Sequence, residues 1–280
     1  MIRIREKILT IGLTTLAILI TLVLVSPFVW IISSSLRPYA SLYSTEFKII
    51  PDDATLDSFR WALFESKFFH WFKNSLIVYI ISLVVSLSIT IPAGYTFSRF
   101  SFFGKNTLLN SYFVLTQFMS GMGIIALIPL YTILVRIRLT NSLVTLGLIY
   151  AASVVPFVTW YLKTYFDSIP RDFDEAAILD GASFSQIWRY VILPISKPGI
   201  YTAIIFISII IWSEWIIGGI LLSADKFTLA VGLVTLQSRW ETPWNHFAAM
   251  ALMYAIPICI IFMLARRYLK AGLTMGGLKG

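Results

Sequence analysis

Long runs of apolar residues alternate with short polar segments along the whole chain. A helix needs about 20 apolar residues to cross the hydrocarbon core of a bilayer. The pattern predicts six membrane-spanning helices, over residues 8–32, 75–95, 108–127, 142–162, 200–222 and 247–265. These runs are continuously apolar, whereas the strands of a membrane β-barrel alternate between apolar and polar residues. We therefore expect an all-α membrane protein with a single domain over residues 1–280.

The composition supports this prediction and argues against a nucleic-acid-binding protein. Hydrophobic residues make up 58% of the chain and charged residues 13%, whereas soluble domains have about 45–50% and 25%. The net charge is +8, but the basic residues lie at the ends of apolar runs and form no stripe that would follow a phosphate backbone. We therefore expect the chain to be surrounded by membrane lipid and not to bind nucleic acid.

The distribution of Lys and Arg predicts that both termini lie in the cytoplasm. With the N-terminus inside, Arg3, Arg5 and Lys7 precede the first run on the inner side, and Arg266 and Arg267 follow the last. Inner loops of membrane proteins carry an excess of basic residues, and long outer loops respond weakly to charge. This orientation also places residues 168–198 in the cytoplasm.

One outer segment, from Phe47 to Lys73, mixes acidic residues with aromatic residues at roughly helical spacing. Two interpretations stay open: an amphipathic helix lying on the membrane surface, or a docking surface for an external partner. His70 and His246 lie near the outer membrane edges without companions at ligand spacing. We interpret them as surface histidines, and no metal site is predicted.

The inner segment over residues 168–198 predicts two short helices. Pro170 suits the entry to the first helix, and the acidic residues Asp172, Asp174 and Glu175 suit its positive N-terminal end. Gly181 then permits a sharp turn. Such a bend outside the membrane makes a firm projection that another protein can grip.

The second of these helices has its own start and stop residues. Ser183 and Gln186 form a capping box that begins it. Pro194 and Pro198 are expected to limit it before the fifth run, because proline disrupts a helix interior.

The same segment resembles the cytoplasmic coupling loop of permeases in binding-protein-dependent ABC importers. That family's signature is E-A-A, three residues, G, nine residues, I, one residue and L-P. The corresponding residues here are Glu175-Ala176-Ala177, Gly181, Val191 and Leu193-Pro194, with Val in place of Ile. Outside the loop, the segment Gly94–Gly104 and the closing Gly272–Gly280 resemble the second permease of the maltose type.

This resemblance implies a bundle of six transmembrane helices with a cytoplasmic coupling helix, in a prokaryotic cytoplasmic membrane. It implies import of a mono- or oligosaccharide by alternating access, with polyols or glycerol phosphates as the alternative cargo. The implied partners are a second, homologous permease, two cytoplasmic ATPase subunits and an extracellular substrate-binding protein. The chain has no G-x-x-x-x-G-K-[ST] loop. We therefore expect no enzyme activity and no cofactor here, with ATP and Mg²⁺ bound in the partner ATPases.

The resemblance also singles out candidate residues for contact with the ATPase. They are Glu175, Ala176, Ala177, Asp180, Gly181 and Ala182. Gly181 would provide the bend, and the alanines are small enough for close contact. The acidic residues would offer charge to the partner or cap the loop internally; for Glu175, a plain helix-terminal acid is the alternative.

The fifth run contains the one acidic residue that lies inside a predicted span, Glu214. Charged residues within a membrane are costly and usually face a cavity or a partner. Trp212 and Trp215 flank it, and aromatic faces pack on sugar rings while a carboxylate accepts hydroxyl donors. The trio is therefore a candidate for the sugar pathway, and an interfacial acid near the outer surface is the alternative.

Two other classes of membrane protein fit the sequence less well. An ion-coupled secondary transporter shares broken helices and several spans, but it has no use for an ATPase-docking loop. A membrane-embedded enzyme needs catalytic groups, and the chain contains no H-E-x-x-H or G-x-S-x-G motif.

Overall fold

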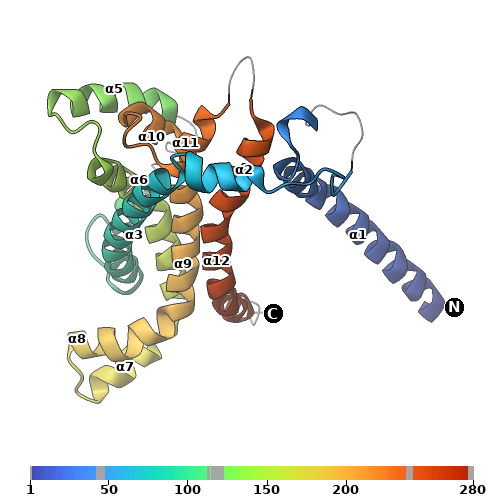
Figure 1. The fold of residues 1–280 in the computed structure, drawn as a ribbon. Helices are drawn as coiled ribbons and strands as arrows, with labels where there is room; N and C mark the ends of the chain where they lie inside the picture. Colours follow the sequence, from blue (N-terminus) through green and yellow to red (C-terminus); the bar gives the residue numbers. More distant parts are fainter. Residues whose placement is uncertain (1, 42–47, 112–113, 115–122, 238–241, 277–280) are drawn as a thin grey trace. The chain divides into compact units, whose positions relative to one another are not determined.

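The computed structural model describes residues 2–41, 48–111, 114, 123–237 and 242–276, and the regular elements of these residues are all helical (Figure 1). They are α1 (Ile2–Ser35), η1 (Tyr39–Ser41), α2 (Asp57–Arg60), η2 (Trp61–Glu65), α3 (Phe68–Arg99), α5 (Gly123–Arg136), α6 (Leu143–Asp167), α7 (Asp172–Leu179), α8 (Phe184–Gln186), η3 (Ile187–Ile192), α9 (Leu193–Ser213), α10 (Ile216–Leu221), α11 (Leu229–Thr235) and α12 (Trp244–Gly276). Residues 105–111 are also helical.

Within the described residues, five helices are long and apolar enough to cross a membrane. They are Leu9–Ser35, Phe68–Arg99, Leu143–Asp167, Phe184–Ser213 and Trp244–Leu264. These confirm helices at the first, second, fourth, fifth and sixth predicted runs. The third run, residues 108–127, lies largely outside the described residues, so the count of six spans stays a prediction.

Contacts between residues group the chain into two compact units. One comprises Met1–Phe69 with Gly232–Ala255, and the other comprises His70–Val231 with Ile256–Gly280. The single permease domain over residues 1–280 stays a prediction.

The first unit is stabilised by aromatic contacts. Trp61 stacks on His246 with ring centroids 4.1 Å apart, and Trp30 meets Trp244 edge-on at 6.3 Å. Helices α2 and η2 confirm that part of the aromatic segment over residues 47–73 is helical, and Phe64 of η2 is exposed. Whether this segment meets lipid or an external partner stays a prediction.

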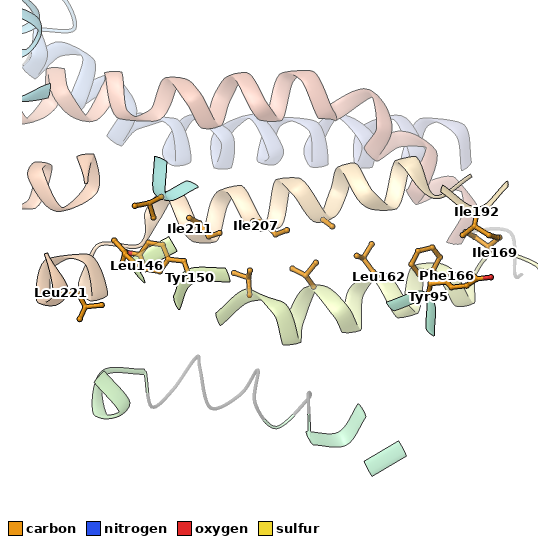
Figure 2. Close-up of a cluster of buried hydrophobic side chains, with 14 of the residues drawn as sticks. Tyr95, Leu146, Tyr150, Leu162, Phe166, Ile169, Ile192, Ile207, Ile211 and Leu221 are labelled. Carbon is orange, nitrogen blue, oxygen red and sulfur yellow. The ribbon is translucent and has the colours of Figure 1, made fainter. Parts of the chain in front are cut away.

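The core of the second unit is a seam between α6 and α9. On α6, Leu146, Tyr150, Val154, Val158, Leu162 and Phe166 are buried at every fourth position, which places them on one face. On α9, Ala203, Ile207 and Ile211 repeat the same spacing. Figure 2 shows the labelled side chains of the two helices facing one another. Ridges at a spacing of four residues interlock when two helices pack.

Helix α3 packs closely against α6 in the same unit. A Cβ added at Gly94 would lie 2.9 Å from the Cβ of Leu162, so only glycine fits there without a shift. The hydroxyl of Ser82 donates to the carbonyl oxygen of Gly147 at 2.8 Å. Small residues and hydrogen bonds of this kind hold helices together in lipid, where no hydrophobic force drives them together.

Candidate functional site

Residues 168–198 contain the two predicted helices, α7 and α8, which Figure 1 shows in yellow at one end of α9. Asp172, Asp174 and Glu175 all lie in the first turn of α7, as predicted. Negative side chains stabilise this end of a helix because the unpaired N–H groups make it positive. We call α7, α8 and the turn between them the hairpin.

The turn of the hairpin depends on Gly181. Its φ of 77° lies in the left-handed region, which residues with a side chain rarely adopt. The N–H of Ala182 donates to the carbonyl of Ala177 and the N–H of Gly181 to that of Ile178, both at 3.0 Å. This pair of bonds is a Schellman motif, which satisfies carbonyl groups at the end of α7. The predicted sharp turn is confirmed.

The capping box that begins the second helix is also confirmed. The backbone N–H of Ser183 donates to Oε1 of Gln186 at 2.7 Å, and the Ser183 side chain caps the helix in return. Both ends of the hairpin turn are therefore held by bonds within the hairpin itself.

The prediction that Pro194 and Pro198 limit the second helix is wrong. Residues Phe184–Ser213 form one continuous helix through α8, η3 and α9. The segment η3 is a π-helical turn, which has i→i+5 bonds and often marks a local irregularity. Pro194 follows this π-helical turn at the start of α9, Pro198 lies inside α9, and the helix continues through both prolines. The second helix of the hairpin is therefore continuous with α9.

The six candidate coupling residues divide into two groups. Glu175, Ala176, Asp180 and Gly181 are exposed, whereas Ala177 and Ala182 are half-buried and pack against the core of this unit. Large apolar or aromatic side chains of the hairpin and η3 are exposed as well: Phe173, Ile178, Leu179, Phe184 and Tyr190. Leu179 is 87% exposed. Apolar groups gathered on one exposed element mark an interaction surface.

Asp174 differs from its acidic neighbours because it points back into the protein. Its Oδ1 accepts a hydrogen bond from the hydroxyl of Tyr95 at 2.7 Å, and its Oδ2 lies 3.0 Å from Nε of Arg99. Arg99 also donates to the carbonyl of Ile169 at 3.0 Å. The sequence alone did not indicate this site. Tyr95 and Arg99 share a face of α3 at a spacing of four, but nothing local selects Asp174 from the three acids of α7.

The predicted fifth span, residues 200–222, is not one continuous helix. Helix α9 ends at Ser213, Glu214 is extended, and α10 begins at Ile216. The carboxylate of Glu214 stabilises the break. One oxygen accepts the N–H of Ile217 at 2.9 Å, and the other accepts the hydroxyl of Tyr150. A side chain that bonds the backbone offers an alternative to the helical ladder.

The structure brings only part of the predicted sugar trio together. Trp212 is buried and makes edge contacts with Phe72 and Tyr79, both with centroids 6.1 Å apart. Trp212 and Glu214 line a small cavity with Ser75, Val78, Tyr79, Tyr150, Ile211 and Thr228. Trp215 is not among the lining residues and is 45% exposed. The cavity volume of ≈ 10 Å³ holds about one water, so the cavity is too small for a sugar.

Neither histidine lies in a ligand cluster among the described residues. Nε2 of His70 donates to the carbonyl of Asp225 at 2.5 Å, and His246 stacks on Trp61. A hydrogen bond from the side chain of Ser223 contributes most to lowering the pKa of the Asp225 carboxyl. The bond from His70 ties the loop after α10 to the start of α3.

Known proteins are similar to this chain over most of its length. The family described as "Binding-protein-dependent transport system inner membrane component" matches residues 90–275. The galactooligosaccharides transport system permease protein GanQ of Bacillus subtilis is 34% identical over 266 residues, which are 92% of this chain and 91% of GanQ. The maltose/maltodextrin transport system permease protein MalG of Vibrio parahaemolyticus is 35% identical over 248 residues, 83% of this chain and 84% of MalG.

A solved structure shows the same fold. It is a chain of a bacterial ABC transporter involved in the import of the acidic polysaccharide alginate, with a TM-score of 0.79 and 23% sequence identity. The similarity covers 94% of this chain and 97% of that one.

Proposed function

Because this chain belongs to the family of binding-protein-dependent transport system inner membrane components, we propose that its hairpin docks on a partner ATPase and carries that partner's motion into the membrane. The chain is a permease subunit of an ABC importer for sugars. The names of its relatives favour oligosaccharides over polyols and glycerol phosphates, and the family does not favour an ion-coupled secondary transporter.

One observation carries the docking proposal. The hairpin has a turn held by its own hydrogen bonds, and it exposes Ile178, Leu179 and Phe184. A rigid projection with exposed apolar side chains is ready to fill a groove without further ordering, which keeps the entropic cost of docking low. The half-buried Ala177 and Ala182 hold the inner face of the hairpin on the rest of the chain.

Other chains would provide the remaining subunits of the importer. A second, homologous permease would complete the pathway, two cytoplasmic ATPases would bind ATP and Mg²⁺, and an extracellular protein would deliver the sugar. Both termini and the hairpin would lie in the cytoplasm, which the distribution of Lys and Arg supports. Closure of the ATPases would then move the hairpin and switch the bundle between inward-facing and outward-facing states.

The assembled complex in proteoliposomes tests this function. The binding protein loaded with the correct oligosaccharide is expected to stimulate ATP hydrolysis and uptake, and the sugar-free binding protein is the control. If one sugar of a tested panel stimulates ATP hydrolysis, that sugar is the transported substrate. Hydrolysis that no sugar stimulates would refute sugar import, and failure to associate with any ATPase would refute the docking role.

Trp212 and Glu214 are the residues that we place on the sugar pathway. In this structure both oxygens of Glu214 are bound by protein donors, so a sugar would replace these donors when the cavity opens. Glu214→Gln keeps an oxygen for the N–H of Ile217 but removes the charge. Since a hydrogen bond to a charged group contributes about 1.5–3 kcal/mol, uptake should fall about tenfold or more while assembly is retained.

The measurement is the initial rate of sugar uptake in proteoliposomes at saturating ATP. Trp215→Phe is the matched control, because Trp215 does not line the cavity and this variant should transport like the wild type. Unchanged uptake by Glu214→Gln would leave Glu214 as a helix-breaking and capping residue only.

A further inference from the structure

Among the residues that the structure describes, the hairpin is connected by the chain to two helices and also contacts a helix that is distant in the sequence. The chain connects it to α6 on one side and, through η3, to α9 on the other. The distant contact is to the end of α3. It consists of Tyr95, Arg99 and Asp174, which we call the α3 clamp.

The polar part of the clamp is shielded from water. The side chains of Arg99 and Asp174 are 8% and 14% exposed. One oxygen of the carboxylate accepts the hydroxyl of Tyr95, and the other is ion-paired with Arg99. An ion pair with this little solvent is weakly screened. Removing one partner of such a pair leaves the other charge buried and uncompensated, which is strongly unfavourable.

An aromatic cluster surrounds the polar part and reaches the second helix of the hairpin. The ring of Tyr95 lies 4.9 Å from that of Trp188 and 6.3 Å from that of Phe184, measured between centroids. It also meets Phe166 of α6 edge-on at 5.6 Å. Tyr95 therefore contacts α7 through its hydroxyl and α8 and η3 through its ring.

The end of α3 is bonded to the α6 side of the hairpin as well. The hydroxyl of Ser98 donates to Oδ1 of Asp167 at 2.8 Å, and Arg171 donates to the carbonyl of Ser98 at 3.4 Å. Together with the close approach at Gly94, these bonds make the inner ends of α3 and α6 and the start of α7 one packed block.

We propose that the α3 clamp makes α3 a third helix that moves with the hairpin, so that Tyr95, Arg99 and Asp174 are positioning residues for the coupling of ATP hydrolysis to transport. Without the clamp, α3 would be held to a displaced hairpin only through the bonds of Ser98 and its packing on α6. With the clamp, the same displacement also pulls on α3, which lines the cavity beside Trp212 through Tyr79. This inference rests on the proposed docking of the hairpin on an ATPase.

The test is the number of sugar molecules taken up per ATP hydrolysed by the reconstituted complex. Asp174→Asn removes the charge of the clamp, and its matched control is Asp172→Asn, which removes the same charge from an exposed position in the same turn of α7. Asp174→Glu restores a carboxylate, and Tyr95→Phe removes one hydrogen bond but keeps the ring.

We expect Asp174→Asn to lower the uptake per ATP about tenfold, in line with the loss of a hydrogen-bonded charge. Association with the ATPase and basal hydrolysis should be retained. Tyr95→Phe should lower the uptake per ATP less than Asp174→Asn does. The double variant, Tyr95→Phe with Asp174→Asn, should have an uptake per ATP no lower than that of Asp174→Asn alone. Asp174→Glu should restore most of the wild-type uptake per ATP. Asp172→Asn should match the wild type.

Two results would overturn the inference. A normal uptake per ATP in Asp174→Asn would show that the clamp is not needed for coupling. Loss of ATPase association in the same variant would show that the clamp is needed only for the folded structure of the hairpin. A wild-type complex that hydrolyses ATP without any response to sugar would instead refute the proposed function, and this inference with it.

Discussion

Gly181→Val is expected to lower coupled transport at least about tenfold while leaving membrane insertion intact. The backbone at Gly181 has a φ of 77°, and a left-handed conformation costs an ordinary residue about 1–2 kcal/mol, with a β-branched one worse still. The strain would open the Schellman turn and change the angle between α7 and α8. Sugar uptake in proteoliposomes should fall at least about tenfold, since about 1.4 kcal/mol corresponds to a factor of ten.

Substitution by asparagine separates the backbone from the side chain at this position. Asparagine tolerates the left-handed region, and a Cβ at Gly181 meets nothing within 4 Å. Gly181→Asn should therefore transport nearly like the wild type. Gly104→Val is a further control, because Gly104 has the same kind of conformation (φ 80°) and equally open space outside the hairpin. Equal uptake by Gly181→Val and wild type would contradict the role of the turn in docking.

Leu179→Glu is expected to release the ATPase from the permease. Leu179 is the most exposed large apolar residue of the hairpin, so its replacement costs the isolated chain little. In the complex, the docked leucine would contribute about 1.5–3 kcal/mol, and a carboxylate buried in its place would be penalised further. Affinity for the ATPase should fall about 100-fold or more, measured by co-purification across a range of ATPase concentrations.

Leu139→Glu provides the matched control for this loss of affinity. Leu139 is an exposed leucine between α5 and α6, on the side that the basic residues predict to be outside the cell. This variant should bind the ATPase like the wild type. Full binding by Leu179→Glu would mean that the exposed apolar side chains of the hairpin do not form the docking surface.

Local chemistry explains why much of the hairpin could be predicted. The turn at Gly181 and the capping box of Ser183 and Gln186 depend on residues at most a few positions apart, so their hydrogen bonds can be derived from the sequence alone. The apolar runs are equally local, since every backbone group of a spanning helix bonds within its own segment. The same local argument failed at Pro194, because the preceding π-helical turn and the surrounding bundle accommodate the proline.

The fifth run shows the opposite case. Its composition alone favours one helix over residues 200–222, yet the helix ends at Ser213. The break depends on Glu214, whose carboxylate bonds Tyr150 on α6 as well as the N–H of Ile217. Half of that arrangement comes from a residue 64 positions away, which no pattern within the run contains.

By itself, the sequence determined that this is a helical membrane protein with an exposed helix–turn–helix hairpin, because length, hydropathy and capping act within single segments. Only the tertiary structure decided which side chains of that hairpin face inward. Three acids begin α7, and Asp174 alone among them meets both Tyr95 and Arg99. The choice depends on how the end of α3 packs beside α6 and α7, and such a contact between distant segments arises only when the chain is folded.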